Sequence, residues 1–566
     1  MKNGTAYQKP FGREIFGRET VVQYIYPREE MAKEEIFPYF VMDGGAFNFA
    51  NDVFGQVDGR DLLEKVMSDE LFEVFRNGSD FNWERSFAYT GDTEFTKKYE
   101  WQIWPQRLYM ILPLAHAFMK TGEARYARKW LETVRGWDQA HPYQEFDPEL
   151  FYLDTDMVWR DMQVAWRTLS LLHSVFMLED APFTEEEWRY LYDFIRLHTN
   201  HLYIEAKDRL ERQKVQNHVL QIGTGLVLAA CLFPEFADAE EYLRIGKDVI
   251  RLNMRGIYAD GGSEEDSPSY SHFIARLYLE AFLLLKNNGK APLEGLEETV
   301  RAQYEWLYQS ITPLGQAPRI SDSYGMDARL DLERVGRLID LKLPDKRGSV
   351  LFPESNYAIL RQGDLTLYVD AVNIPRQWGH IHCGRPQILL FYRDFPILTD
   401  MGICSYDRWE FYAYVQRIEH HNVVFSPAVD RATLVQETGI RSFAEDQVTF
   451  TSHVTDDTGT DFLWTRTVSL NEDTVTIRDH VDSVKPMPWR AHLLFQRMDI
   501  NTRDDRKMQA LVGDDTLLNV YTEQPYFTDL APVMNDRNRI DYGIVMECGA
   551  QGAAYDNTVK MEFLKR

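Results

Sequence analysis

The stretch from Trp378 to Asn422 reads WGHIHCGRPQILLFYRDFPILTDMGICSYDRWEFYAYVQRIEHHN, and the rest of the chain is organised around it. Two apolar runs in it, 387–392 and 395–399, are rich in aliphatic and aromatic residues and are separated by the turn Arg393-Asp394. This pattern predicts two antiparallel strands joined by a tight turn. Acidic and imidazole side chains flank both runs, so the predicted hairpin would bring them together.

Three of these flanking side chains are candidate metal ligands. His382 precedes the first run, Asp400 follows the second, and His421 precedes a further strand-like segment, 423–425. Two imidazole nitrogens and one carboxylate oxygen form a ligand set that zinc accepts. His380 is then left beside the metal. The alternative of ordinary polar residues at strand ends stays open, because the spacing is not that of a compact zinc finger.

Length and charge limit the classes of protein to which the chain can belong. With 566 residues it is too long for one ordinary domain, so two or three domains are expected. It carries 88 acidic and 62 basic residues, a net charge of −26. This balance favours a soluble protein that nucleic acid and anionic membranes repel, and neither is expected as a partner. An anionic substrate would need a local basic cleft.

The sequence shows no sign of export or membrane insertion. The start, Met1 to Tyr7, has no apolar run after a basic end, and no later stretch has about 18 uninterrupted apolar residues. The four cysteines are scattered and predict no disulfide framework. A cytoplasmic location is the simplest expectation, although a secreted or periplasmic protein trimmed of its signal would look the same.

Between about residues 60 and 345, apolar residues recur at three- and four-residue spacing, which predicts helices. Gly, Pro, Asp and Asn occupy the breaks between them. The predicted helices span 62–75, 101–120, 123–140, 156–178, 185–204, 216–232, 239–255, 271–287, 296–311 and 327–341. Helices joined by short loops predict antiparallel hairpins that close into an incomplete α/α toroid. A solenoid of helical repeats is the alternative, but no fixed repeat period supports it.

After about residue 350 the pattern changes to short β-branched or aromatic segments separated by turns. The predicted strands span 357–361, 365–372, 387–392, 448–454, 465–471, 474–481, 490–496 and 544–547. They predict an antiparallel β-sandwich that reaches the C-terminus, with 343–352 as the linker. The chain is therefore expected to be an α+β multidomain protein: an extension, 1–60, a toroid domain, 61–345, and a β-sandwich domain, 346–566, that carries the metal site.

Two segments of the helical half carry further candidate residues. Asn217 and His218 open a predicted helix, where the helix dipole favours a nearby carboxylate; an N-cap Asn with an incidental His is the alternative. The Gly-rich loop 260–270 contains three consecutive acids and ends in Tyr270 at a helix start, where a packed aromatic ring is the alternative. The three acids, 264–266, could form the carboxylate pair of a glycoside hydrolase.

An amide, imidazoles and a phenol also suit the chemistry of a uronic acid. Removing the proton α to a carboxylate requires donors that neutralise the carboxylate, because the dianion formed otherwise is too costly. Asn and protonated His are such donors. Tyr and His can move the proton from C5 to the departing O4.

Together these stretches resemble the heparinase II/III superfamily of polysaccharide lyases, which includes oligoalginate lyases. The resemblance covers roughly residues 60 to 560, and the joint occurrence of four motifs is more specific than any one of them. The motifs are Asn217-His218; Asp260-Gly261-Gly262-Ser263 through Ser267-Pro268 to Tyr270; Gly379-His380-Ile381-His382 with Asp400-Met401-Gly402; and His421-Asn422.

The resemblance implies a role for each catalytic candidate. Asn217 and His380 would hold and neutralise the substrate carboxylate. Tyr270 would be the catalytic acid, and in some members also the base. His218 would be the base for the epimer whose C5 proton lies on the other face, and Tyr406 matches a tyrosine that lines the cleft.

By the same resemblance, His382, Asp400 and His421 would bind a structural zinc that ties the β-domain loop together and places His380. The family usually has a small residue and then Asp after the metal-binding histidine, whereas Cys383 and Gly384 stand here. This departure affects the surroundings of the metal rather than the ligand. Cys383 is a weaker candidate ligand.

The expected function is that of an enzyme, a lyase that cleaves (1→4) bonds to uronic acid residues by β-elimination and leaves a 4,5-unsaturated uronate. The substrate is expected to be a polysaccharide or oligosaccharide of alginate or glycosaminoglycan type, and a homodimer is a possible assembly. Arg212 and Arg376 flank the motifs and could bind further acidic groups, with surface solvation as the alternative. A toroidal hydrolase acting on unsaturated uronides and a non-catalytic carbohydrate-binding protein are the alternative functions.

Overall fold

The computed structural model of the chain describes residues 6–8, 21–26, 31–32, 59–68, 105–149, 158–323, 325–344, 346, 348–373, 380–403, 415–430, 433–536 and 539–566. The chain forms two compact units. Unit 1 comprises 1–256, 273–300 and 333–340, and unit 2 comprises 257–272, 301–332 and 341–566. The units alternate along the chain before residue 341, and the single boundary at 345/346 stays a prediction.

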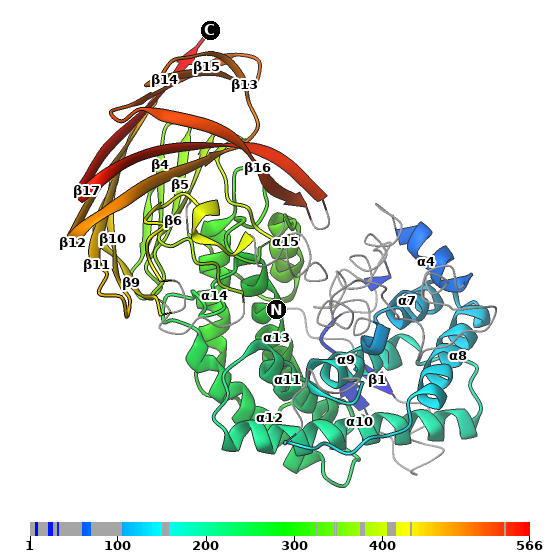
Figure 1. The fold of residues 1–566 in the computed structure, drawn as a ribbon. Coiled ribbons are helices and arrows are strands. Elements are labelled where there is room, and N and C mark those ends of the chain that lie inside the picture. The colour runs from blue at the N-terminus through cyan, green and yellow to red at the C-terminus, as the bar shows by residue number, and fades with distance from the viewer. Residues whose placement is uncertain are drawn as a thin grey trace. The chain divides into compact units, whose positions relative to one another are not determined.

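The described residues before the strands of unit 2 form ten α-helices, labelled in Figure 1. They are α4 (Gly59–Met67), α7 (Ile111–Thr121), α8 (Ala124–Ala140), α9 (Asp161–Met177), α10 (Glu185–Glu211), α11 (Asn217–Leu232), α12 (Ala239–Asn253), α13 (Pro268–Asn287), α14 (Leu296–Ser310) and α15 (Ala328–Leu338). Short strands β1 (Ala6–Gln8) and β2 (Val21–Gln23) pair antiparallel near the start of the chain. No helix in the described part is both long enough and apolar enough to cross a membrane.

The helix boundaries follow the predicted periodicity in part. The helix expected over 62–75 spans Gly59–Met67, the one expected over 156–178 begins at Asp161, and two further helices also differ. The helix expected to begin at 101 begins at Ile111, because Leu108 adopts a left-handed backbone with φ of 55° and ends the preceding 3₁₀ turn. The helix expected over 185–204 continues to Glu211. It begins with a capping box in which the Thr184 side chain and Glu187 satisfy each other's backbone N–H groups.

Helix α11 packs against α9, α10 and α12 and is buried along almost its whole length. It packs closely against α12 through two glycines. A Cβ on Gly223 would lie 2.7 Å from Cγ1 of Val249, and one on Gly246 would lie 2.9 Å from the carbonyl oxygen of Gly223. Larger residues would push the helices apart, so these glycines hold the position of α11, whose first residues are two of the candidates.

Unit 2 is dominated by antiparallel strands. They are β3 (Val350–Phe352), β4 (Tyr357–Gln362), β5 (Leu365–Asp370), β6 (Gln387–Tyr392), β7 (Phe395–Leu398), β8 (Val424–Phe425), β9 (Val435–Ala444), β10 (Gln447–Thr455), β11 (Asp461–Asn471), β12 (Thr474–Phe495), β13 (Asp499–Arg503), β14 (Lys507–Val512), β15 (Thr516–Thr522), β16 (Tyr526–Asp536) and β17 (Arg539–Lys565). The main path of the sheet runs β13-β14-β15-β17-β12-β7-β6-β5-β4-β3. Strands β9, β10 and β11 extend it from β12.

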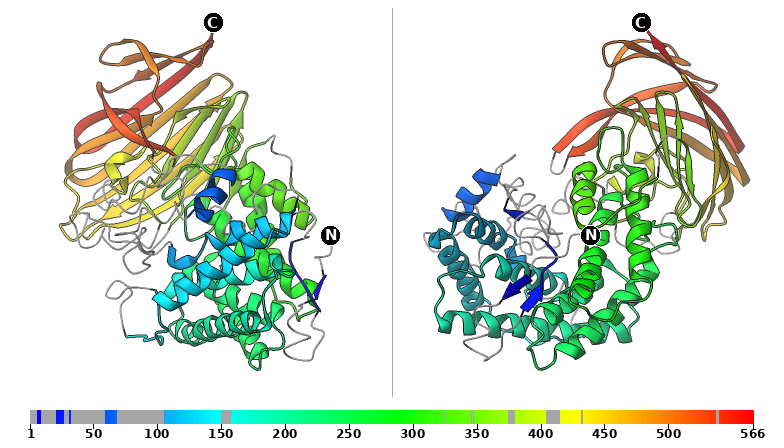
Figure 2. Two further views of the ribbon diagram at one scale, coloured as in Figure 1. Left: turned by 90° about the vertical axis from the view of Figure 1, so that its right-hand side faces the viewer. Right: turned by 180° about the vertical axis from the view of Figure 1, so that it is seen from behind.

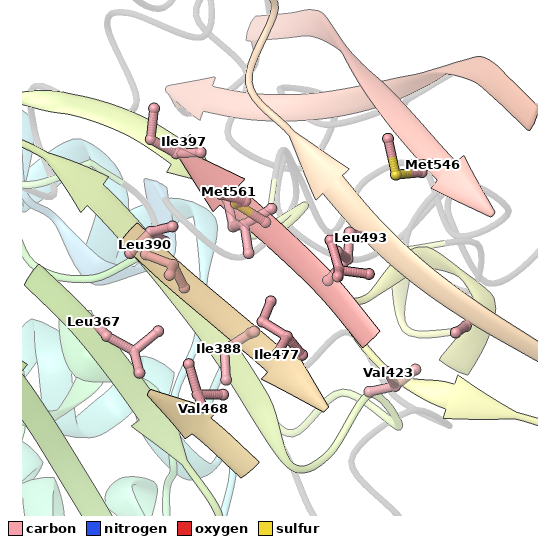
Figure 3. Close-up of a cluster of buried hydrophobic side chains, with 14 of the residues drawn as sticks. Leu367, Ile388, Leu390, Ile397, Val423, Val468, Ile477, Leu493, Met546 and Met561 are labelled. Atoms are coloured by element: carbon pink, nitrogen blue, oxygen red, sulfur yellow. The ribbon is translucent and has the colours of Figure 1, made fainter. Parts of the chain in front are cut away.

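One hydrophobic core joins the early and late strands of unit 2. Figure 2 shows the early strands, coloured yellow-green, facing the later strands, coloured orange to red. Leu367 and Leu390 from the early strands lie near Val468, Ile477 and Met561 from the late strands (Figure 3), and all five are buried. This confirms the predicted fold class, a helical N-terminal part followed by an antiparallel β domain.

Two predicted strands, 474–481 and 490–496, are parts of the single strand β12. Pro486 and Pro488 interrupt the sequence pattern between them. In the structure the pairing with β17 shifts register between Asp482 and Met487, and the strand continues beyond the irregularity. The prediction also missed β9, the strands between β12 and β17, and β3, which lies at the end of the predicted linker 343–352.

Candidate active site

The Gly-rich loop before α13 is fixed by contacts within unit 2. Gly261 has a φ of 94°, and a Cβ there would overlap the backbone of Ala302, so only glycine fits. The Asp260 carboxylate accepts hydrogen bonds from the backbone N–H groups of Gly262 (3.2 Å) and Ser355 (2.8 Å). These contacts set the path of the chain into the first turn of α13, where Tyr270 lies.

Tyr270 and His380 meet although 110 positions separate them in the sequence. Their rings are stacked, with centroids 3.5 Å apart and planes 23° from parallel. Nδ1 of His380 lies 2.9 Å from Oδ2 of Asp322, and Nε2 lies 3.8 Å from Oε2 of Glu265. Both rings are partly exposed. The phenol and one of the predicted imidazoles therefore form one site in unit 2.

Asp322 contacts both His380 and His382, and it was not identified as a candidate from the sequence. Its side chain is fully buried, and its second oxygen, Oδ1, lies 2.8 Å from Nε2 of His382. Its backbone N–H donates to the carbonyl of His380 (3.0 Å). Burial alone would raise the pKa of Asp322, but the hydrogen bonds and charges of the two histidines lower it to about 2. One carboxylate thus joins His380 to His382.

Nothing local in the sequence marks Asp322, which stands in the loop Ser321-Asp322-Ser323. The structure shows why the loop is ordered: Ser323 Oγ accepts the backbone N–H of Ser269 (3.1 Å) at the start of α13. It also lies 2.9 Å from Oγ of Ser267. Ser267 and Ser269, on either side of Pro268, were the residues in the sequence that could have indicated a polar contact between this helix start and another loop.

His382, Asp400 and His421 lie together as the sequence predicts. Each offers one ligand atom, and these atoms lie within 4.8 Å of one another. All three are buried, and Nδ1 of His421 lies 2.6 Å from Oδ1 of Asp400. Nδ1 of His382 and Nε2 of His421 are buried and find no hydrogen-bond partner among the described residues. Two buried imidazole nitrogens without partners, beside a carboxylate, fit a metal ion.

The charge of Asp400 also suits a ligand. Burial would raise its pKa, but the neighbouring His421 and His382 lower it below its usual range. The carboxylate therefore stays ionised, which is the form that binds metal.

Cys383 and Gly384 stand where the heparinase II/III family usually has a small residue and then Asp, and the structure explains the glycine. A Cβ on Gly384 would overlap the imidazole ring of His421, so glycine is required beside this ring. In the described part of the chain, the group within ligand distance does not include Cys383. Its backbone N–H donates to the carbonyl of Gln416 (3.0 Å).

Asn422, the residue after His421, holds three strands together. Its Nδ2 donates to the carbonyls of Ile388 and Thr399, both at 2.8 Å, and its Oδ1 accepts the N–H of Leu494 at 2.6 Å. These partners lie on β6, directly after β7, and on β12. Asn422 is fully buried and does not contact solvent. Its role is to position the neighbouring ligand, His421.

Asn217 and His218 belong to unit 1, in the first turn of α11. The N-cap is Gln216, so the alternative of an N-cap Asn217 is wrong. Asn217 is buried, and its Oδ1 accepts a long hydrogen bond from Nε2 of Gln221 (3.4 Å). His218 is partly exposed, and its Nδ1 lies 2.7 Å from Oδ2 of Asp161, a second residue that the sequence did not point to.

The remaining candidates divide into two groups. Arg212 caps the end of α10, where its side chain is 44% exposed and donates to Asp208 (2.7 Å). Arg376 and Tyr406 lie outside the described residues. Their roles and that of Arg212 stay predictions.

Two of the three loop acids lie beside basic side chains. Asp266 makes a buried ion pair with Arg385, and Glu265 faces His380. A hydrolase needs two carboxylates that are free to act on one glycosidic bond. The arrangement of Asp266 and Glu265 therefore disfavours the hydrolytic alternative.

Two family models match most of the chain, from residue 48 to residue 531. Residues 48–340 match the family model described as "Heparinase II/III N-terminus", and residues 344–531 match the one described as "Heparinase II/III-like, C-terminal". The two matches leave only a short gap at the end of α15.

Individual relatives agree with the family matches. The chain is 25% identical over 253 residues to a heparin-sulfate lyase of Pedobacter heparinus, covering 42% of this chain and 36% of the relative. It is 24% identical over 381 residues to a heparin-sulfate lyase of Bacteroides thetaiotaomicron, covering 59% and 51%. The matches thus span between about a third and a half of the length of these relatives.

A crystal structure of heparinase III shares the fold. Its TM-score is 0.73 at 15% identity, and the match covers 92% of this chain and 84% of that structure. At this identity the likeness shows the fold alone.

Proposed function

We propose that this chain, which belongs to the heparinase II/III family, is a polysaccharide lyase that cleaves (1→4) bonds to uronic acid residues by β-elimination. The product would carry a 4,5-unsaturated uronate at its new non-reducing end. The observation that carries the proposal is the stacked pair of Tyr270 and His380, with Nδ1 of His380 held by the buried Asp322. A phenol beside a fixed imidazole suits proton transfer next to a carboxylate.

The reaction needs one base, one acid and a way to stabilise negative charge. The base takes the C5 proton, and the electron pair of the C5–H bond forms the C4–C5 double bond. The C4–O4 bond breaks, and its electrons go to O4, which takes a proton from the acid. No water is consumed, so the atoms balance without a co-reactant.

We assign these roles to four side chains. His380 and Asn217 bind the uronate carboxylate and stabilise the charge that develops on it as C5 loses its proton. Tyr270 donates the proton to O4. For one C5 epimer Tyr270 is also the base, and for the other epimer His218 is the base.

The finer identity of the metal is part of this proposal. His382, Asp400 and His421 supply the ligand set of zinc, and the two unpartnered imidazole nitrogens support a bound cation. Bound zinc would supply a cross-link between the segment before β6, the end of β7 and the segment before β8. His380, two residues before His382, would be held in place through that segment and through Asp322.

The proposed substrate class is a glycosaminoglycan-type uronate glycan, since the relatives with the reported matches are heparin-sulfate lyases. Alginate-type glycans stay in the test set. Arg212, Arg376 and Tyr406 are proposed to bind the substrate outside the reacting sugar. We also propose the finer architecture, an incomplete toroid followed by a β-sandwich, because heparinase III shares the fold.

The test is a panel of glucuronate-, iduronate- and alginate-containing glycans, followed by the ultraviolet absorbance of the unsaturated product. Tyr270→Phe should abolish product formation while binding of the glycan is kept. Tyr521→Phe, on strand β15 of the same unit, is the matched control and should leave turnover unchanged. New reducing ends without ultraviolet absorbance would indicate a hydrolase, and binding without any product would indicate a carbohydrate-binding protein.

A further inference from the structure

Asp161 makes the shortest described contact to His218. It is the first residue of α9, and its Oδ2 lies 2.7 Å from Nδ1 of His218, the second residue of α11. The side chains are 15% and 18% exposed, so water competes little for this hydrogen bond. The contact joins two helices of unit 1 that also pack against each other.

The backbone at Asp161 is unusual. Its φ is 50°, in the left-handed region, which Asp and Asn tolerate better than most residues. This conformation at the start of α9 aims the carboxylate at α11. The same property makes Asn a conservative replacement for the backbone.

The groups around Asp161 keep its carboxylate ionised. Burial would raise the pKa of Asp161, but the charge and hydrogen bond of His218, the charge of Arg209 and the N–H of Met162 lower it to about 2. Arg209 on α10 also donates to Glu205 (2.6 Å). An ionised carboxylate accepts hydrogen bonds and donates none.

Glu205, the other acid of this cluster, behaves differently. It is fully buried, and burial, with a smaller contribution from the charge of Asp161, raises its pKa to about 7 although the charge and hydrogen bond of Arg209 act in the opposite direction. Arg209 forms its close ion pair with Glu205, and its charge also lowers the pKa of Asp161. Asp208 on α10 is a further charged neighbour, with its Oδ2 3.6 Å from Nη1 of Arg209.

A consequence follows for the two ring nitrogens of His218. Because Asp161 can only accept, a neutral His218 must carry its proton on Nδ1. Its Nε2 then has a free lone pair. This is the form in which an imidazole acts as a general base, and a carboxylate behind the ring stabilises the imidazolium formed after proton transfer.

We propose that Asp161 is a positioning residue that holds His218 in the tautomer with a basic Nε2, and that it thereby decides whether uronates of one C5 configuration are cleaved. The inference rests on the proposed function and adds to it. Nε2 takes the C5 proton, the electron pair of the C5–H bond forms the C4–C5 double bond, and the C4–O4 bond breaks as O4 takes a proton from the catalytic acid. Uronates of the other C5 configuration use Tyr270 as base and do not need Asp161.

Asp161→Asn tests the proposal. We expect kcat to fall about 10- to 100-fold, as when a partner that orients a metal-bound histidine is removed. The loss should appear on only one of two glycans that differ in C5 configuration, and KM should change little. In a His218→Gln background, Asp161→Asn should cause no further loss, because both changes remove the same function.

A second measurement does not depend on turnover. In protein labelled with ¹⁵N-histidine, the ring nitrogen shifts of His218, assigned with His218→Gln, should show the Nδ1–H tautomer in the wild type and a changed tautomer balance in Asp161→Asn. Asp461→Asn is the control, since it removes the 2.9 Å contact of an exposed pair with His453 on other strands. It should leave the signals of His218 and the activity unchanged.

The outcomes separate the two levels of the argument. An Asp161→Asn protein with wild-type kcat on both epimers, or with an unchanged His218 tautomer, overturns the role of Asp161. Equal loss on both epimers overturns the specificity that we assign to it. If no glycan gives unsaturated product, the proposed function fails, while the tautomer measurement still decides what Asp161 does to His218.

Discussion

Asp322→Asn is the most informative single change in the described structure. The replacement keeps the volume of the side chain but exchanges one carboxylate oxygen for an NH₂ group and removes the charge. Of the two contacts, to His380 at 2.9 Å and to His382 at 2.8 Å, only one can keep an acceptor. A hydrogen bond to a charged group contributes about 1.5–3 kcal/mol. We therefore expect a loss of about 2–3 kcal/mol in the free energy of unfolding of unit 2.

That loss corresponds to a fall in Tm of about 5–10 °C for a domain of this size. Calorimetry is the suitable assay, because it shows whether a protein of two units unfolds in one transition or in two. Metal content and kcat should be measured on the same samples. We expect weaker metal retention and a kcat lowered about 10- to 100-fold, since His380 and His382 lose a shared support.

The matched control is Asp364→Asn, which removes a carboxylate from the half-exposed pair with Arg393 on the surface of unit 2. It should change Tm and kcat little, because exposed ion pairs contribute little to stability. If Asp322→Asn keeps the wild-type Tm, metal content and kcat, Asp322 does not link the two histidines in the working protein, and the argument for a shared support is wrong.

Three further predictions concern the metal and the pH dependence of stability. Chelation should lower the Tm of unit 2 before turnover is lost at moderate temperature; calorimetry beside the ultraviolet assay checks this. Gly384→Ala should displace His421 and cost about 1–3 kcal/mol or more together with metal content, because the new Cβ overlaps its ring. His201 is buried, and burial followed by the charge of Arg167 lowers its pKa to about 3. The unfolded chain therefore binds the extra proton between about pH 6.5 and 3, and stability should fall as pH drops through this range; His201→Phe should make the fall shallower.

Each of these has a contrary result. Turnover abolished by chelation in a folded protein would show that the metal takes part in the chemistry. A Gly384→Ala protein with full metal content would show that His421 can move without losing its ligand role. Identical acid unfolding of the wild type and His201→Phe would show that His201 does not contribute to the loss of stability at low pH.

The parts of the fold that depend on local periodicity could be predicted from the sequence. Helix α8 shows the three- and four-residue spacing along its whole length, and its predicted bounds differ from the observed ones by one residue. The hairpin β6–β7 brought His382 and Asp400 within reach of one another because both lie next to the strands that pair. Features of this kind need only short-range information.

The supporting residues could not be predicted in this way. Asp322 and Asp161 act on histidines that are 58 and 57 positions away, and neither stands in a pattern that indicates a function. Their partners are decided by how helices and loops pack, which is a property of the whole unit. The same is true of Gly384, where the need for glycine arises from the ring of His421.

The hydrogen bonds of Asn422 have a consequence for how the protein opens. One amide group connects β6, the end of β7 and β12, so separation of any of these strands breaks a bond at the residue next to a metal ligand. The N–H of Leu494 donates to Asn422. It should therefore exchange with deuterium at the rate at which the strands around the ligands His382, Asp400 and His421 separate. The exchange rate of this one backbone amide would measure how long the metal-binding site stays folded, and the experiment needs no metal probe.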